Sequence, residues 1–119
     1  MHLTPDLVAC YQGCQFEITL RTYWFKLSVF GNINSISLKD GKVRIAASVV
    51  AQRDASRGKK PTFARPDKQA FDTVVDPRLY VLKKTIDGKL VFRSRLCEET
   101  LTLFPAGYIN FDPAKVKSL

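Results

Sequence analysis

The sequence predicts an all-β protein, mainly an antiparallel β-barrel with one or two short helices. Two observations predict this class. Several stretches alternate apolar and polar residues with a period of two, which is typical of strands with one buried face. Two Asp-Gly dipeptides, Asp40-Gly41 and Asp87-Gly88, each separate two such stretches, as the turn of a β-hairpin does. A β-sandwich or a curved open sheet fits the same strands and remains an alternative.

The length and composition indicate a single domain. The 119 residues, 45% of them hydrophobic, suffice for a core without disulfides or a structural metal. We expect an N-terminal segment with a short helix at 1–15, a β core at 16–104 that carries a basic loop at 52–66, and a C-terminal tail at 105–119.

The cysteine count bears on the cellular compartment. Three cysteines cannot all pair within one chain, which favours free thiols in a reducing, cytoplasmic environment. The first residues lack the basic and apolar regions of a signal peptide. The longest mostly apolar run, 45–51, is too short to cross a bilayer. We therefore expect no membrane partner.

The N-terminal part predicts a helix followed by one long strand. Thr4 and Pro5 have the positions of an N-cap and a first helical residue, so a short helix should extend to about Tyr11. Residues 16–29 then alternate with a period of two, but the apolar set changes face at Thr22-Tyr23. A change of face is typical of a bulge or a sharp bend, so we expect a single bent strand here.

The middle of the chain predicts two hairpins around a short helix. Both Asp-Gly dipeptides supply the positive φ angles of a two-residue type I′ turn. This register places Leu38 opposite Val43 in the first hairpin and Val81 near Phe92 in the second. Between the hairpins, apolar residues within 67–75 have helical spacing. One or two helical turns are therefore expected there, with irregular structure as the alternative.

This order of elements resembles that of the oligonucleotide/oligosaccharide-binding (OB) barrel over roughly residues 16–96. A long bent strand, a hairpin, a short helix and a second hairpin follow one another in both. The resemblance is one of topology, since the sequence contains no motif of a named family, and it implies a fold but no function.

The residue types that carry catalysis in most enzymes are absent or scattered. His2 is the only histidine, which argues against a Ser-His-Asp or Cys-His arrangement. The six glycines stand alone, so no phosphate-binding loop is present. The spacing of Cys10 and Cys14 is not that of a zinc knuckle, and few other soft ligands exist. We therefore expect a non-catalytic protein with no cofactor and no metal site.

The distribution of positive charge points to a class of partner. The net charge is +8, and most of it lies in two segments. Residues 51–68 hold six Lys or Arg against two Asp, and residues 78–95 hold six against one Asp. Clustered cations of this kind attract polyanions, which makes nucleic acid the expected partner.

Two basic surfaces are candidates for the contact. In the register of a two-residue turn, one face of the second hairpin mixes cations with an aromatic ring and has no acidic residue, as single strands require. The loop at 52–66 could fold over a phosphodiester backbone. A solvated sheet face and a mobile insertion are the respective alternatives. The candidate residues are Tyr80, Lys84, Lys89, Arg93 and Arg95 on the hairpin, and Arg53, Arg57, Lys59, Lys60, Phe63 and Arg65 on the loop.

Aromatic residues outside these surfaces are expected to pack in the core. Trp24, between two other aromatic residues, is the uncertain case, with stacking on a base as the alternative to burial.

The sequence therefore favours a non-catalytic β-barrel module that binds nucleic acid, with single-stranded DNA or RNA and low sequence specificity expected. A small structural or assembly protein is the first alternative, for example a homo-oligomeric virion or packaging component with a basic genome-facing surface. An adaptor that binds an acidic protein is the second.

Overall fold

The computed structural model describes residues 2–65 and 69–112, which form one eight-stranded antiparallel sheet with little helix. The all-β class is therefore confirmed. The elements in chain order are α1 (Pro5–Ala9), β1 (Gln15–Arg21), β2 (Phe25–Lys39), β3 (Lys42–Ser56), β4 (Thr62–Ala64), β5 (Ala70–Val75), the 3₁₀ turn η1 (Pro77–Leu79), β6 (Tyr80–Lys84), β7 (Leu90–Ser94) and β8 (Glu99–Leu103).

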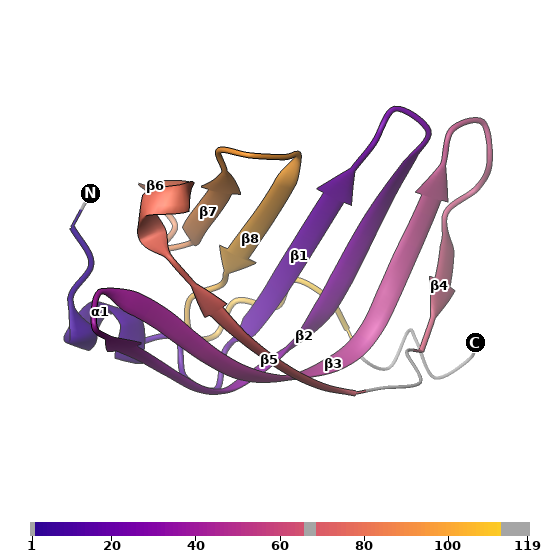
Figure 1. Cartoon of the computed structure of the whole chain (residues 1–119). Coiled ribbons are helices and arrows are strands. Elements are labelled where there is room, and N and C mark those ends of the chain that lie inside the picture. The colour runs from indigo at the N-terminus through magenta and orange to yellow at the C-terminus, as the bar shows by residue number, and fades with distance from the viewer. Residues whose placement is uncertain (1, 66–68, 113–119) are drawn as a thin grey trace.

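The strands form a curved sheet that is not closed. Their order is β4-β3-β2-β1-β8-β7-β6, and β5 pairs with the first half of β3 (Figure 1). Among the described residues, β6 pairs only with β7 and β4 only with β3, so the sheet ends in two separate edges. A closed barrel is thus not confirmed, and the arrangement is consistent with the alternative of a curved open sheet.

The core lies on the concave side of this sheet. Inward side chains of the central strands are almost fully buried, including Phe16, Phe92 and Leu103. The N-terminal segment adds Val8 and Tyr11, which are also buried. Helix α1 starts as predicted, because Thr4 Oγ1 accepts a hydrogen bond from the Leu7 N–H at 3.2 Å. Most of the buried apolar side chains therefore belong to one hydrophobic cluster.

The predicted single bent strand at 16–29 was wrong, because the chain reverses between β1 and β2. Arg21 pairs with Lys26, and the Thr22 N–H donates to the Phe25 carbonyl at 2.9 Å. The Thr22 hydroxyl also accepts from the Phe25 N–H at 3.2 Å. The hydrogen bonds of the Thr22 hydroxyl stabilise this turn, which contains none of the usual turn residues Gly, Asn or Pro. The sequence therefore gives no local sign of the turn. The change of apolar face marks a hairpin and not a bulge.

The first Asp-Gly hairpin joins β2 and β3 as predicted. Asp40 and Gly41 have φ angles of 54° and 73°, and Leu38 pairs with Val43. The long arms contain two register shifts, at Phe30/Gly31 and at Ile33/Ser35. Each shift lets the arms bend with the sheet.

The predicted helix within 67–75 was wrong for its described part, which is strand β5. Its residues pair with β3, for example Val75 with Val43 and Phe71 with Ala47. Val75 is buried in the core. The β-branched residues Thr73, Val74 and Val75 fit a pleated surface better than a helix, and the free edge of β3 offers them a partner.

The second Asp-Gly hairpin joins β6 and β7, but its predicted register was wrong. The Thr85 N–H donates to the Lys89 carbonyl at 2.9 Å, and the Gly88 N–H donates to the Thr85 carbonyl at 3.0 Å. The loop thus has three residues, with Gly88 at φ 90°, which is a type I turn followed by a bulge. Compared with a two-residue loop, the three-residue loop shifts the pairing of β6 with β7 by one residue.

A shift of one residue exchanges the two faces of a strand. Phe92 therefore pairs with Leu82 and not with Val81, and Tyr80 pairs with Ser94. Tyr80 and Leu82 pack against the core, whereas Val81 and Arg93 form a pair on the convex side. The predicted basic face of this hairpin is consequently divided between the two sides of the sheet.

Candidate nucleic-acid interface

Two hairpin tips lie side by side at one end of the sheet. They are the β1–β2 tip (22–24) and the β3–β4 tip (57–61), and we call them the paired tips (Figure 1). They are neighbours because β2 and β3 pair up to their ends, where Phe25 faces Ser56. A hydrogen bond joins them directly, since the Arg57 N–H donates to the Trp24 carbonyl at 2.9 Å.

The paired tips expose two aromatic rings to solvent. Tyr23 is 70% exposed and Trp24 is 69% exposed. The rings meet edge to face with centroids 4.7 Å apart, and the guanidinium carbon of Arg57 lies 4.9 Å from the Tyr23 centroid. The expectation that Trp24 lies in the core was therefore wrong. Leaving a side chain of this size in water forgoes roughly 2 kcal/mol of burial free energy, which a partner can recover.

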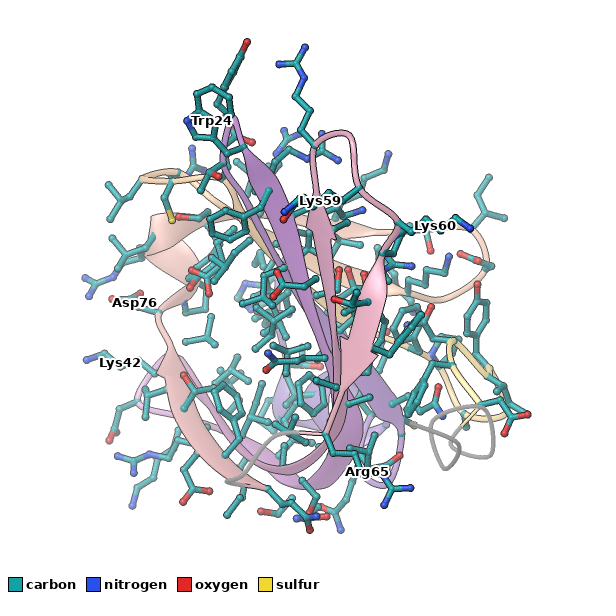
Figure 2. The ribbon with its side chains drawn as sticks, turned by 90° about the vertical axis from the view of Figure 1, so that its right-hand side faces the viewer. Trp24, Lys42, Lys59, Lys60, Arg65 and Asp76 are labelled. Carbon is teal, nitrogen blue, oxygen red and sulfur yellow. The ribbon has the colours of Figure 1, made fainter. Side chains whose placement is uncertain are left out.

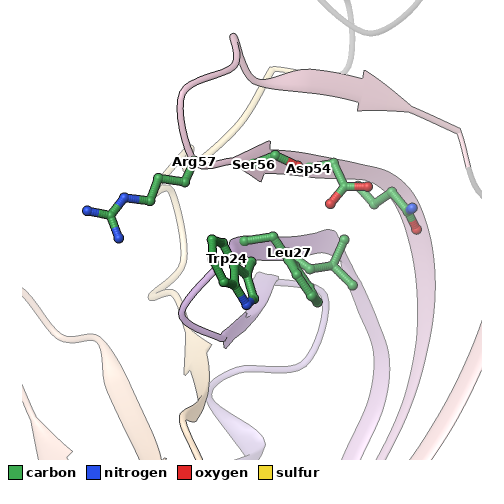
Figure 3. Close-up of a pocket in the computed structure, with 7 residues that line it drawn as sticks. Trp24, Leu27, Asp54, Ser56 and Arg57 are labelled. Atoms are coloured by element: carbon green, nitrogen blue, oxygen red, sulfur yellow. The ribbon is translucent and has the colours of Figure 1, made fainter.

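A shallow recess of about 570 Å³ lies next to the paired tips on the concave side. Its β2 wall is apolar, and its β3 wall carries hydrogen-bonding groups, because β-pairing sets Leu27 opposite Asp54 and Phe25 opposite Ser56. Figure 3 shows Trp24 and Leu27 next to each other below the β3 residues, with the Arg57 side chain extending outward. The lining residues are Trp24, Phe25, Leu27, Gln52, Asp54, Ser56 and Arg57. An apolar wall with a few polar groups is the usual composition of a ligand site.

Exposed cations stand on the β3–β4 tip, next to the recess. Arg57, Lys59 and Lys60 stand on the β3–β4 tip, and Figure 2 places Lys59 and Lys60 toward the same end of the molecule as Trp24. Neither ion pair found among the described residues involves them. Their charge is therefore not compensated by a salt bridge within the described part of the chain, and it attracts anions.

The segment 52–66 was expected to be an irregular loop, but its described part, residues 52–65, is largely a hairpin, since β3 continues to Ser56 and β4 follows. Arg53 pairs with Phe63 across it. Strand alternation places both side chains on the convex side, away from Asp54, and the Arg53 guanidinium lies 5.7 Å from the Phe30 centroid. Figure 2 shows Arg65 far from Lys59 and Lys60. Three of the six predicted loop residues thus belong to the paired tips, namely Arg57, Lys59 and Lys60.

The predicted residues of β6 and β7 lie toward the other end of the sheet order. Tyr80 packs edge-on against Phe92 with centroids 6.1 Å apart, and burial raises the pKa of its phenol above the usual value. Lys84, four residues after Tyr80 on the same strand, points to the same concave side, and Arg93 points to the convex side. Arg93 therefore does not share a face with Tyr80 and Lys84, and strands β2, β1 and β8 separate all three from β3.

Lys89 and Arg95 have local roles in the fold. The Lys89 ammonium lies 3.5 Å from an Asp87 carboxylate oxygen and 4.8 Å from the Tyr108 ring centroid. The backbone N–H of Arg95 donates to the Leu79 carbonyl at 2.9 Å, which joins η1 to the end of β7. Whether either side chain contacts a partner stays a prediction.

Sequence reasoning missed Tyr23 and the polar wall of the recess, and it gave the exposed position of Trp24 only as an alternative to burial. The signal for the rings was present, because three consecutive aromatic residues stand where the alternation changes face. Asp54 and Ser56 carried no local signal. They become part of a recess only through the pairing of β2 with β3.

Two other classes of site have no candidate in the described part of the chain. Residues 2–65 and 69–112 contain no group of three or more His, Cys, Asp or Glu placed to hold a metal ion. None of their helices has the length and apolar character needed to span a membrane. No protein-family model, curated protein or solved structure matches the chain. The candidate site therefore rests on its own geometry and charge.

Proposed function

We propose that the protein is a non-catalytic module that binds single-stranded nucleic acid at the paired tips, with low sequence specificity along the strand. One observation supports this most directly: the exposed rings of Tyr23 and Trp24 meet, and Arg57 lies over the Tyr23 ring. Lys59 and Lys60 are on the same tips, and neither forms an ion pair with another described residue. Single strands are bound by rings that stack on bases together with cations that neutralise phosphates. Duplex DNA offers no free base faces, and no helix of the described chain is long enough to read a groove.

The chain offers a direct optical test, because Trp24 is its only tryptophan. A base that stacks on Trp24 should quench its fluorescence, while anisotropy of a labelled oligonucleotide reports binding independently. We expect both signals to saturate together with single strands, and affinity to fall steeply as salt is raised. Absence of binding to single strands at low salt would reject the proposal.

Two pairs of variants locate the contact. Trp24→Ala should weaken binding roughly tenfold through lost stacking, whereas Leu96→Ala, which removes another exposed apolar side chain, should not. Lys60→Glu should weaken binding and reduce its salt dependence. Lys42→Glu makes the same charge change at the turn between β2 and β3, away from the paired tips, and should weaken binding less (Figure 2). Equal losses in both lysine variants would mean that only the overall charge matters.

A second candidate function is self-assembly, as in a small structural or packaging protein. The observation that favours it is the outer edge of β6, which pairs with no other strand of the described chain and lies beside the exposed Leu79 and Val81. Unpaired edges pair readily with a second chain. Light scattering without nucleic acid would show closed oligomers in this case and a monomer in the first. An adaptor for acidic proteins would stay monomeric and ignore oligonucleotides at physiological salt.

A further inference from the structure

We propose that the recess beside the paired tips binds one nucleobase and that it prefers guanine. This inference rests on the proposed function and adds to it the chemical class of base that is read at a single position. The rest of the strand would be held by charge and stacking without regard to sequence.

The apolar wall of the recess suits the flat face of a base. This wall is formed by Trp24 on the β1–β2 tip and by Phe25 and Leu27 at the start of β2. Phe25 is partly exposed and Trp24 largely so. A base placed on this wall covers apolar surface that is otherwise in contact with water.

The polar wall carries a negative charge in a cationic site. Asp54 is exposed, and its carboxylate forms no hydrogen bond or ion pair with another described residue. An ionised carboxylate only accepts hydrogen bonds. It also repels phosphate, so the part of a nucleotide that faces Asp54 must donate hydrogen bonds, as a base edge with N–H groups does. Arg57, Lys59 and Lys60 nearby make a free cation an unsuitable occupant.

Guanine alone among the four bases presents two neighbouring donors on one edge. Its N1–H and N2–H can bond to the two oxygens of one carboxylate, as a guanidinium does. Adenine and cytosine present one amino group beside an acceptor nitrogen. Thymine and uracil present one N–H between two carbonyl oxygens, which a carboxylate repels. The side chain of Asp54 therefore selects guanine by its hydrogen-bonding pattern.

Gln52 completes the match. It lines the same recess and lies two residues before Asp54, so both side chains point to one face of β3, about 7 Å apart along the strand. The Gln52 amide can donate to guanine O6 while Asp54 accepts from N1 and N2. Figure 3 shows the Arg57 side chain directed outward. This direction suits a contact with the phosphate of the nucleotide and not with its base.

The test uses short oligothymidine strands whose central position is each of the four bases in turn. Binding to the whole protein is followed by anisotropy and by quenching of Trp24. We expect the strand with guanine to bind roughly tenfold more tightly than the other three. GMP, AMP, CMP and UMP are titrated in parallel to distinguish a base within a strand from a free nucleotide.

Asp54→Asn keeps the shape of the side chain and removes its charge. It should abolish the advantage of guanine while binding of the all-thymidine strand is kept or slightly tightened, because a negative charge is lost from the site. Asp72→Asn is the matched control, since Asp72 is exposed on β5 and outside the recess. It should leave the preference for guanine unchanged.

The outcomes separate this inference from the proposed function. Equal binding of the four strands would overturn the guanine preference and leave single-strand binding in place. A preference that survives Asp54→Asn would overturn the assignment of Asp54. Binding of no strand would reject the proposed function, and selective quenching by GMP in that case would assign the recess to a free guanine nucleotide.

Discussion

The two Asp-Gly hairpins contain the same dipeptide, but their β-bulges lie in different parts of the hairpin, in the arms of the first and in the turn of the second. The β2–β3 hairpin has a regular two-residue turn, and its arms of 15 residues contain two register shifts. The β6–β7 hairpin has arms of five residues in unbroken register, and its bulge lies in the turn at Gly88. In both cases the bulge decides which side chains face the core.

The difference arises from contacts outside the dipeptide. The Thr85 hydroxyl accepts a hydrogen bond from the Lys89 N–H at 2.9 Å and donates to the Asp87 carboxylate. This hydrogen bond lowers the pKa of Asp87 below its ordinary value. The Tyr11 hydroxyl also donates to the Gly88 carbonyl at 2.8 Å. The three-residue loop is therefore fixed both by a neighbour in sequence and by the N-terminal segment, whereas the first turn has no comparable partner among the described residues.

The largest effect should come from filling the bulge in the arms of the first hairpin. In Gly31→Ala, the new Cβ would lie 2.1 Å from the Ser48 carbonyl oxygen and 2.7 Å from the Phe16 ring. Backbone cannot yield as a flexible side chain does, so we expect a loss of about 3 kcal/mol in the free energy of unfolding. Thermal unfolding should then occur roughly 10 °C lower. A variant as stable as the parent would show that β2 and β3 are not this close.

A smaller effect is expected from filling the bulge in the second turn. Gly88→Ala places a Cβ in the left-handed region and 3.2 Å from Pro105 Cβ, which should cost about 2 kcal/mol. Gly41→Ala is the matched variant, since its φ is also positive but no atom lies within 4 Å. It should cost only about 1 kcal/mol. Equal costs, measured by urea unfolding, would mean that Pro105 does not support the second turn.

The smallest effect should come from making the second turn like the first. Deletion of Ile86, whose side chain is fully exposed, leaves Asp87-Gly88 as a two-residue loop between Thr85 and Lys89. The pairing of Lys84 with Leu90 is unchanged, so we expect the melting temperature to move by roughly 3 °C or less. Nuclear Overhauser contacts between Tyr80 and Phe92 should persist.

Deletion of Lys83 is the control for this variant, because it removes one residue from the arm and not from the turn. It should move the side chains of β6 that precede residue 83 to the opposite face of the sheet and so destabilise the protein strongly. Loss of the Tyr80–Phe92 contacts in both variants would show that the three-residue loop itself sets the register.

Much of the fold was predictable because it is local. The all-β class, the N-cap at Thr4 and the turn at Asp40-Gly41 each depend on a few neighbouring residues. One error, the missed reversal at Thr22, is local, but the turn contains none of the usual turn residues. In the other two errors a distant partner contributes. Residues 70–75 became a strand because β3 had a free edge, and Asp87-Gly88 gained a third loop residue through Thr85 and Tyr11.

The candidate site shows the same division. Arg57, Lys59 and Lys60 were predicted from the clustering of charge in the sequence. The position of Trp24 depended on an unrecognised chain reversal at Thr22, and the role of Asp54 on the pairing of β2 with β3. Tyr80 was assigned to the wrong side because a register error of one residue exchanges the faces of a strand. A prediction of surfaces is thus only as good as the prediction of register.

The central position of β1 affects how the chain can fold while it is being made on a ribosome. One edge of β1 pairs with β2, which follows immediately, but the other pairs with β8, so that Phe16 meets Leu103. The nascent chain therefore carries an uncovered β1 edge and an open apolar face until nearly all of the strands have emerged. Chaperones that bind exposed apolar strands would meet the protein during this interval, before release of the C-terminal strand completes the sheet.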